Sequence, residues 1–265
     1  MNGCIHAGIG IAMVVGLALA GCGGGGSAEG QDPGPTPANP ANAAGLWRGP
    51  ATVAGSAVQY GASALVTANG HALIYIQSLD STIPPTLSPT IIEGNFVDAA
   101  GELALSGATF YSLLSPKTGS VTGRFVGTAH ATATGTLTFA STTYNVSLAY
   151  DTQYDRASSL AAIGGVYTRS APSGYTMTIT INPDGTLNGT DTLSCIYSGN
   201  VTADLPAVNA YALNWIGTGC TNSNRNGTFA GRLALVDSAT VNGAKALAWF
   251  AHSASDPLLP QLPEK

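Results

Sequence analysis

The sequence predicts an all-β fold of two tandem antiparallel domains, and three observations support this prediction. Only 9% of the 265 residues are charged, whereas long surface helices depend on Lys, Glu and Arg. The polar and small residues are instead mainly Thr, Ser, Asn and 34 glycines, which suit strands and turns. After residue 44 apolar and polar residues alternate with a period of two, and no segment of ten residues shows a capped helical period.

The chain begins with an apolar run, Ile5–Ala20, of about 16 residues, which is shorter than the roughly 20 that a membrane-spanning helix needs. It ends in Leu19-Ala20-Gly21-Cys22, which resembles the lipobox of bacterial lipoproteins. The resemblance implies removal of residues 1–21, a diacylglycerol thioether on Cys22 and an acylated amino group. Residues 1–5 contain no Lys or Arg, and this departs from the basic start that signal peptides have.

Residues 22–44 follow as a segment rich in Gly, Pro, Ala and Asn, which cannot bury apolar area and predicts a disordered tether. Such a chain spans on the order of 25 Å root-mean-square. Gly23 stands where the enteric lipoproteins that this motif resembles carry the Asp that retains them at the inner membrane. We therefore expect a lipid anchor in the outer membrane, on its periplasmic face or at the cell surface.

Two blocks of predicted strands follow, at 45–154 and 165–255. Thr143–Leu148 alternates in the first block and Tyr175–Ile181 in the second, where Asn182-Pro183-Asp184-Gly185 has the residues of a hairpin turn. Residues 155–164 form the predicted linker, with one helical turn within Ala157–Ile163, and 256–265 form a C-terminal tail. We expect the second block to fold on its own.

Landmarks recur in the same order in both blocks, which favours a duplicated β-domain over two unrelated domains with common turn residues. The pairs are Gly45-Leu46-Trp47 with Gly165-Val166-Tyr167, Ala68-Asn69-Gly70 with Pro183-Asp184-Gly185, Gly94-Asn95 with Gly199-Asn200, and Gly123-Arg124-Phe125 with Gly231-Arg232-Leu233.

Four cysteines agree with an extracytoplasmic location. Cys4 leaves with the signal peptide and Cys22 takes the lipid, so Cys195 and Cys220 remain as an even pair in an oxidising compartment. A disulfide between them would stabilise the fold by about 3.5 kcal/mol on the chain-entropy model. The alternatives are two free buried thiols or half of a metal site, although no further His or Cys lies nearby in the sequence to complete one.

One segment of the first block resembles a barrel family. Gly123-Arg124-Phe125-Val126-Gly127, followed by Gly135-Thr136-Leu137-Thr138-Phe139, is similar to the G-x-F-x-G…G-x-F segment of transferrin-binding protein B and factor-H-binding-type surface lipoproteins. The resemblance implies eight-stranded barrels, so we expect two tandem antiparallel β-barrel-like domains. His130 and Thr132 depart from this pattern, because Ala and Glu are expected there.

The sequence favours no catalytic or cofactor-dependent function. The net charge of −5 argues against nucleic-acid binding, and the hydrolase and phosphate-binding motifs are absent from the sequence. His71, His130 and His252 are widely separated, which indicates solvated side chains rather than a metal or catalytic site. We interpret Trp47 and the two other tryptophans as core residues. We expect no enzyme activity, no metal and no cofactor.

Three functions remain open. The first is a non-catalytic binding module for a protein or a cell-envelope polymer, with a Pro-rich loop at Thr82–Thr90 and two arginines at matching repeat positions as its candidate contacts. The candidate partner-binding residues are Pro84, Pro85, Arg124 and Arg232. The second is a lipocalin-like carrier of a small apolar ligand, which needs a cavity inside a barrel. The third is an envelope hydrolase with scattered catalytic residues.

Overall fold

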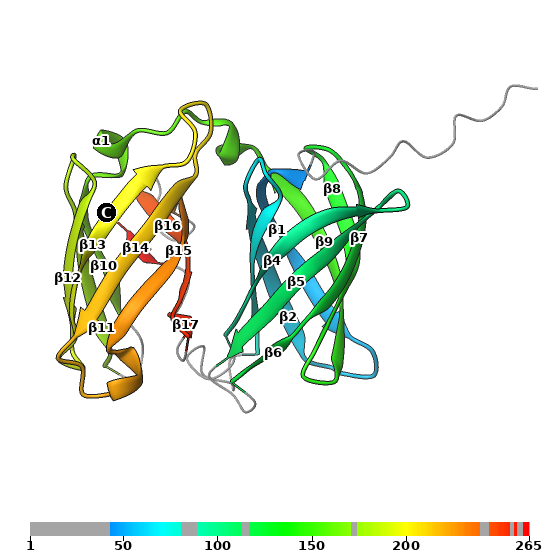
Figure 1. Ribbon diagram of the computed structural model, residues 1–265, viewed down its shortest axis with the longest axis horizontal. Coiled ribbons are helices and arrows are strands. Elements are labelled where there is room, and N and C mark those ends of the chain that lie inside the picture. Colours follow the sequence, from blue (N-terminus) through cyan, green and yellow to red (C-terminus); the bar gives the residue numbers. More distant parts are fainter. Residues whose placement is uncertain are drawn as a thin grey trace, which may run out of the picture. The chain divides into compact units, whose positions relative to one another are not determined.

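The computed structural model describes residues 43–80, 89–112, 117–170, 174–238, 244–254, 257–258 and 262–264. These residues form two antiparallel sheets within one compact unit, Thr36–Lys265, and each sheet curls into a barrel (Figure 1). The prediction of two tandem barrels is confirmed. The predicted signal peptide, Cys22 and the predicted tether up to residue 42 lie outside the described residues, as do Pro84 and Pro85.

The first barrel is an eight-stranded meander that closes on itself. Each long strand pairs with the next long strand along the chain, and β1 pairs with β9 to complete the ring. The short β6 and the following β7 both pair with β5. Its strands are β1 (Gly45–Val53), β2 (Gln59–Val66), β3 (His71–Ser78), β4 (Thr90–Ala99), β5 (Glu102–Ser112), β6 (Thr118–Ser120), β7 (Thr122–Thr128), β8 (Thr132–Phe139) and β9 (Thr142–Asp151).

The second barrel repeats this path with seven strands and is nearly closed. The short β17 and β18 pair with the remaining edge of β16, so residues from the predicted tail belong to the sheet. Its strands are β10 (Gly165–Ser170), β11 (Thr176–Ile181), β12 (Thr186–Asp191), β13 (Ile196–Ala203), β14 (Tyr211–Thr218), β15 (Gly227–Asp237), β16 (Lys245–His252), β17 (Pro257–Leu258) and β18 (Leu262–Glu264).

A short connection joins the barrels. A 3-10 turn, η2 (Thr152–Asp155), follows β9, and the single helical turn α1 (Leu160–Ile163) precedes β10. Ser159 caps α1, because its hydroxyl accepts a hydrogen bond from the Ala162 N–H. The predicted helical turn within Ala157–Ile163 is confirmed.

The repeated landmarks occupy equivalent positions in the two barrels. The Trp47 indole N–H donates to the Ala43 carbonyl at 2.8 Å, and the Tyr167 hydroxyl donates to the Ile163 carbonyl at 2.8 Å. In both barrels, an inward aromatic side chain near the start of the first strand donates a hydrogen bond to the carbonyl of the residue four positions earlier. Gly70 and Gly185 have positive φ angles, 85° and 87°, in the hairpins that follow. These parallels support the duplication hypothesis.

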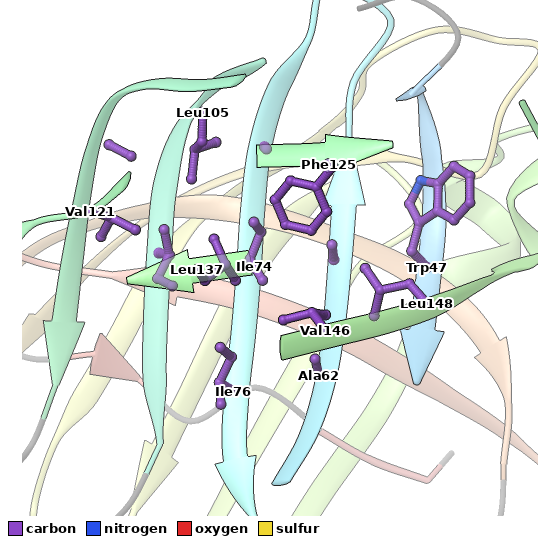
Figure 2. Close-up of a cluster of buried hydrophobic side chains, with 14 of the residues drawn as sticks. Trp47, Ala62, Ile74, Ile76, Leu105, Val121, Phe125, Leu137, Val146 and Leu148 are labelled. Atoms are coloured by element: carbon purple, nitrogen blue, oxygen red, sulfur yellow. The ribbon is translucent and has the colours of Figure 1, made fainter. Parts of the chain in front are cut away.

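Three buried clusters hold the structure together. One fills much of the first barrel (Figure 2) and a second fills the other barrel. The third lies between outer faces of the barrels, where β2, β3 and β4 carry apolar residues toward β15 and β16. Its largest members are Leu46, Leu65, Leu73, Tyr75, Ile91, Tyr154, Val236 and Phe250. Because separated barrels would expose this cluster, independent folding of the second block stays a prediction.

Candidate ligand-binding site

A cavity of about 320 Å³ lies inside one end of the first barrel, where the β4–β5 and β7–β8 hairpins turn. Eight strands are enough to hold one small ligand in a barrel interior. The cavity is lined by Ala43, Trp47, Ala64, Val66, Ile74, Phe96, Gly101, Leu103, Phe125, Val126, Gly127, Thr128, Ala129, Thr132, Ala133 and Leu148.

Small residues on β7 and β8 leave this space open. Gly127 and Ala133 face each other across the two strands, and Gly135 lies opposite Phe125. A Cβ atom on Gly135 would lie 2.7 Å from the Phe125 ring, so the glycine lets this ring pack against the backbone. The small residues along β8 therefore have two effects: Gly135 accommodates a large neighbour, and Ala133 borders the cavity.

Larger side chains form the rest of the wall. Figure 2 shows Trp47, Phe125 and Leu148 among the inward side chains, from β1, β7 and β9. Phe125 packs edge-to-face on Phe96 with ring centroids 5.3 Å apart. Buried residues such as Leu137 continue the core beyond the cavity, so the first barrel is hollow at one end and packed along the rest.

Aromatic contacts hold the position of Trp47. Tyr150 packs edge-on against its ring at 5.2 Å, and His130 from the β7–β8 turn stacks on Tyr150 at 4.5 Å. The Tyr150 hydroxyl donates to the Asp155 carboxylate at 2.6 Å, and burial together with this bond raises the pKa of Tyr150. Trp47 is thus held by its contact with Tyr150 and by its hydrogen bond to the Ala43 carbonyl.

The cavity wall carries no ionisable side chain. Its sixteen lining residues are apolar or glycine except for Thr128 and Thr132, which lie beside the β7–β8 turn. The only other side-chain donor, the Trp47 indole, already binds the Ala43 carbonyl. The lining side chains can therefore enclose mainly apolar surface.

The second barrel is filled by aromatic rings. Trp215 stacks on Tyr197 at 4.9 Å and contacts Trp249 at 4.6 Å, and each of these rings is almost completely buried. At one end the buried Asp191 carboxylate accepts hydrogen bonds from Tyr197 and Tyr175. Burial raises the pKa of Tyr175 to about 12. Sequence analysis placed all three tryptophans in the core, and the structure buries all three.

The disulfide between Cys195 and Cys220 is present, which confirms the predicted pairing. Cys195 precedes β13 and Cys220 follows β14, two strands that pair with each other. The bridge therefore closes the end of this strand pair, with a sequence separation of 25 residues.

The two candidate partner-binding arginines are both engaged in ion pairs. Arg124 on β7 lies 3.2 Å from Glu102, and Arg232 on β15 lies 3.0 Å from Asp204. Arg232 also borders a second cavity of about 280 Å³, together with Tyr154. The structure does not bring the two arginines to one site, and the predicted lipidation site Cys22 and the loop prolines 84 and 85 lie outside the described residues.

Sequence reasoning missed a histidine–carboxylate cluster. Glu93 accepts hydrogen bonds from Nε2 of His71 on β3, at 2.9 Å, and from Nε2 of His252 on β16, at 2.8 Å. These bonds hold the pKa of Glu93 well below its usual range. Tyr111 stacks on His252 with ring centroids 3.6 Å apart. The expectation of separate, solvated histidines is wrong for His71 and His252, because the β3–β4 pairing places His71 beside Glu93 and the packing of the second barrel brings His252 to the same carboxylate.

Within the described residues, no group of three His, Cys, Asp or Glu side chains is arranged to hold a metal ion. No helix in this part of the chain is long and apolar enough to cross a membrane.

The comparisons with known proteins give no relative. No family model, no curated protein and no solved structure matches this chain. Its resemblance to the surface-lipoprotein barrels therefore stays a hypothesis.

Proposed function

We propose that this chain is a lipid-anchored, non-catalytic binding protein whose first barrel takes up a small apolar molecule. The observation that carries the proposal is the cavity of about 320 Å³, whose lining side chains are apolar apart from two threonines. Its volume falls at the lower end of the range of small-molecule sites, about 300–1,000 Å³. This favours the carrier hypothesis over a module that binds only through its loops.

The chemistry of the wall supports a binding role without catalysis. General acid–base and nucleophilic catalysis need titratable or activated groups within hydrogen-bond distance of the ligand. The lining residues include no titratable side chain, and their only hydroxyl groups are those of two threonines.

The lipid anchor is part of the proposal and rests on the lipobox-like Leu19-Ala20-Gly21-Cys22. With it, the carrier stays at the outer membrane, and the predicted tether ends before Ala43 and Ala44, which are buried in the clusters within and beside the first barrel. We expect a Cys22→Ser variant to lose both palmitate labelling and membrane association. Normal labelling of this variant would rule out the anchor.

A protein or cell-envelope polymer as partner stays a prediction. Arg124 and Arg232 are paired with carboxylates, and the residues of the Pro-rich loop that carry the other candidates lie outside the described residues.

Ligand uptake is tested on the chain from residue 22 onward, carrying Cys22→Ser to keep it soluble. We expect saturable, one-to-one binding of the neutral naphthalene dye 6-propionyl-2-dimethylaminonaphthalene, seen as a blue-shifted emission. Ala133→Leu should abolish binding, because the longer side chain enters the cavity.

The matched control is Thr134→Leu, which adds a similar side chain to the exposed face of the same strand, β8. It should bind the dye as the parent chain does. Absence of saturable binding in the parent chain contradicts the proposal, as does equal binding by the Ala133→Leu variant when it is folded by circular dichroism.

A further inference from the structure

We propose that the second cavity, between the two barrels, binds a neutral ring sugar beside the ion pair of Arg232 and Asp204. This site is separate from the cavity inside the first barrel, and the proposal does not depend on the proposed function. It rests on the space beside the ion pair, on the hydrogen-bonding groups that border this space, and on the charges in its wall, which cancel.

Both barrels contribute to this cavity of about 280 Å³. An apolar protein cavity of about 150 Å³ accepts one benzene ring, so the larger space accommodates one six-membered ring with its substituents. The cavity is lined by Thr67, Ala68 and Asn69 from the β2–β3 turn, Tyr154 from η2, Asp204, Leu205, Val208 and Ala210 from the β13–β14 connection, and Arg232 from β15. Neither barrel forms the site alone.

The ion pair in the wall leaves hydrogen-bonding capacity unused. Nε of Arg232 lies 3.0 Å from Oδ2 of Asp204, yet both atoms are buried and neither is aligned for a hydrogen bond within the described residues. Nη1 of Arg232 donates to the Gly231 carbonyl at 3.0 Å. Nη2 of Arg232 and Oδ1 of Asp204 have no hydrogen-bond partner in the described part of the chain, and neither is among its buried atoms. A ligand in the cavity can therefore satisfy one donor group and one acceptor that lie side by side.

Asn69 supplies a second donor from the first barrel. Its amide oxygen accepts hydrogen bonds from the Thr67 hydroxyl and the His71 N–H inside the β2–β3 turn. These bonds assign the oxygen to the turn side of the amide, so Nδ2 and its two N–H donors are left on the other side. Asn69 is exposed and borders the cavity. A ligand there meets donors from both barrels and one carboxylate oxygen.

These groups favour ring hydroxyls. Arg232 and Asp204 cancel each other's charge, so an anion or a cation would be attracted by one side chain and repelled by the other. A zwitterion would lose more hydration than a neutral ligand on entering the cavity. A trans peptide group carries its N–H and C=O on opposite sides and cannot satisfy two adjacent groups at once. A hydroxyl group both donates and accepts, and adjacent ring hydroxyls match an adjacent donor and acceptor.

The remaining wall suits the C–H face of a sugar ring. Tyr154 and Ala210 are buried and border the cavity, and Val208 is half-buried beside them. Leu205 is exposed at the opening. Apolar walls with a few placed polar groups are the usual composition of small-molecule sites.

The test is a titration of the isotope-labelled chain from residue 22 onward, carrying Cys22→Ser, with methyl β-D-glucopyranoside, followed through its backbone amide resonances. We expect saturable shifts with a Kd in the millimolar range at Asn69, Asp204 and Val208, and no shift at Ala133 in the first barrel. Tetrahydropyran-2-methanol has the same ring without the adjacent ring hydroxyls. It should bind at least about tenfold more weakly, since it cannot satisfy the donor and the acceptor together.

Two variants and a matched control locate the binding groups. Arg232→Met should weaken sugar binding at least about tenfold, because it removes Nη2. Asn69→Ala, a change at an exposed turn residue, should weaken binding severalfold. The control is Arg124→Met, because Arg124 occupies the matching position in the first barrel, pairs with Glu102 and borders neither cavity. This variant should bind the sugar as the parent chain does.

A comparison with methyl β-cellobioside identifies the source of the sugar. Tighter binding of this disaccharide than of the monosaccharide indicates a glycan chain, and weaker binding indicates a free monosaccharide; both support the sugar site. Absence of saturable shifts in the parent chain overturns the proposal. Shifts confined to the first-barrel cavity, or equal sugar binding by folded Arg232→Met and Arg124→Met variants, also overturn it. Binding of L-alanine or of N-acetyl-L-alanine methylamide at Asn69 and Val208 without sugar binding would show that the ligand class is wrong.

Discussion

The two barrels follow the same strand path, yet one is hollow at one end and the other is filled with rings. Strand register shows which inward positions of the two barrels correspond. Gly123 pairs with Leu137 in the first barrel and Gly231 pairs with Ala251 in the second. Two residues further along, Gly135 lies opposite Phe125 in the first barrel, whereas Trp249 lies opposite Leu233 in the second.

This difference shows that the fold alone does not decide whether a barrel binds a ligand. Trp249 contacts Trp215 at 4.6 Å in the interior of the second barrel, where its counterpart in the first barrel, Gly135, contributes no side chain. The side chains that face inward decide how much space remains, and the outward residues leave it unchanged. The second barrel also carries the disulfide. Under the proposed function, the second barrel stabilises the chain and the first barrel takes up the ligand.

The largest expected effect comes from removing one aromatic ring from the interior of the second barrel. Trp249→Ala should destabilise the protein by about 3–5 kcal/mol, because it removes a fully buried ring from a packed interior. Trp47→Ala should cost at least about 1 kcal/mol less, because one side of Trp47 already borders a cavity. Urea unfolding followed by circular dichroism measures both, and equal losses would contradict the difference in packing.

Opening the disulfide should be nearly as large an effect and confined to the second barrel. The bridge closes 25 residues, so the Cys195→Ser, Cys220→Ser double variant should lose about 3.5 kcal/mol on the chain-entropy model. Hydrogen exchange should show the loss in β13 and β14 and leave β7 and β8 protected. Protection lost equally from both barrels would mean that they unfold as a single unit.

The matched arginines offer a smaller contrast. Arg232 is 27% exposed beside Asp204, whereas Arg124 is 65% exposed beside Glu102. Arg232→Met should cost about 1–2 kcal/mol, because it leaves the half-buried Asp204 without its partner. Arg124→Met should change stability by less than about 0.5 kcal/mol, as exposed ion pairs do. Thermal unfolding of both variants measures the two losses of stability. A larger loss for Arg124→Met than for Arg232→Met would show that burial does not set the strength of these ion pairs.

The smallest expected effect concerns the contact between the barrels at Glu93. Because the bonds from His71 and His252 lower the pKa of Glu93 in the folded state, the carboxylate stabilises the fold above its unfolded pKa of about 4.3. This stabilisation is lost progressively as the pH falls below that value. Glu93→Gln should cost about 1 kcal/mol at pH 7, after allowance for partial exposure, and less near pH 3. A difference that stays constant between pH 7 and 3 would contradict this assignment.

The sequence by itself determined the strand content, the tandem order, the helical turn before β10 and the pairing of Cys195 with Cys220. These features depend on patterns that lie close together in the chain, such as the alternation at Tyr175–Ile181 and the turn residues at Asn182–Gly185. The cysteine pairing followed from their number and compartment rather than from geometry.

Only the tertiary structure decided which barrel is hollow, and that Glu93 joins His71 to His252. The cavity depends on the summed volume of side chains from eight different strands and the turns between them, and single-residue patterns do not report this sum. Ala133 and Gly135 were equally compatible with a cavity or with a thin, closed barrel. Glu93 and His252 lie 159 positions apart and meet only because the two barrels pack against each other at β4 and β16. Local residue patterns therefore specified the strands. The packing of side chains within and between the barrels specified the cavity and the Glu93 cluster.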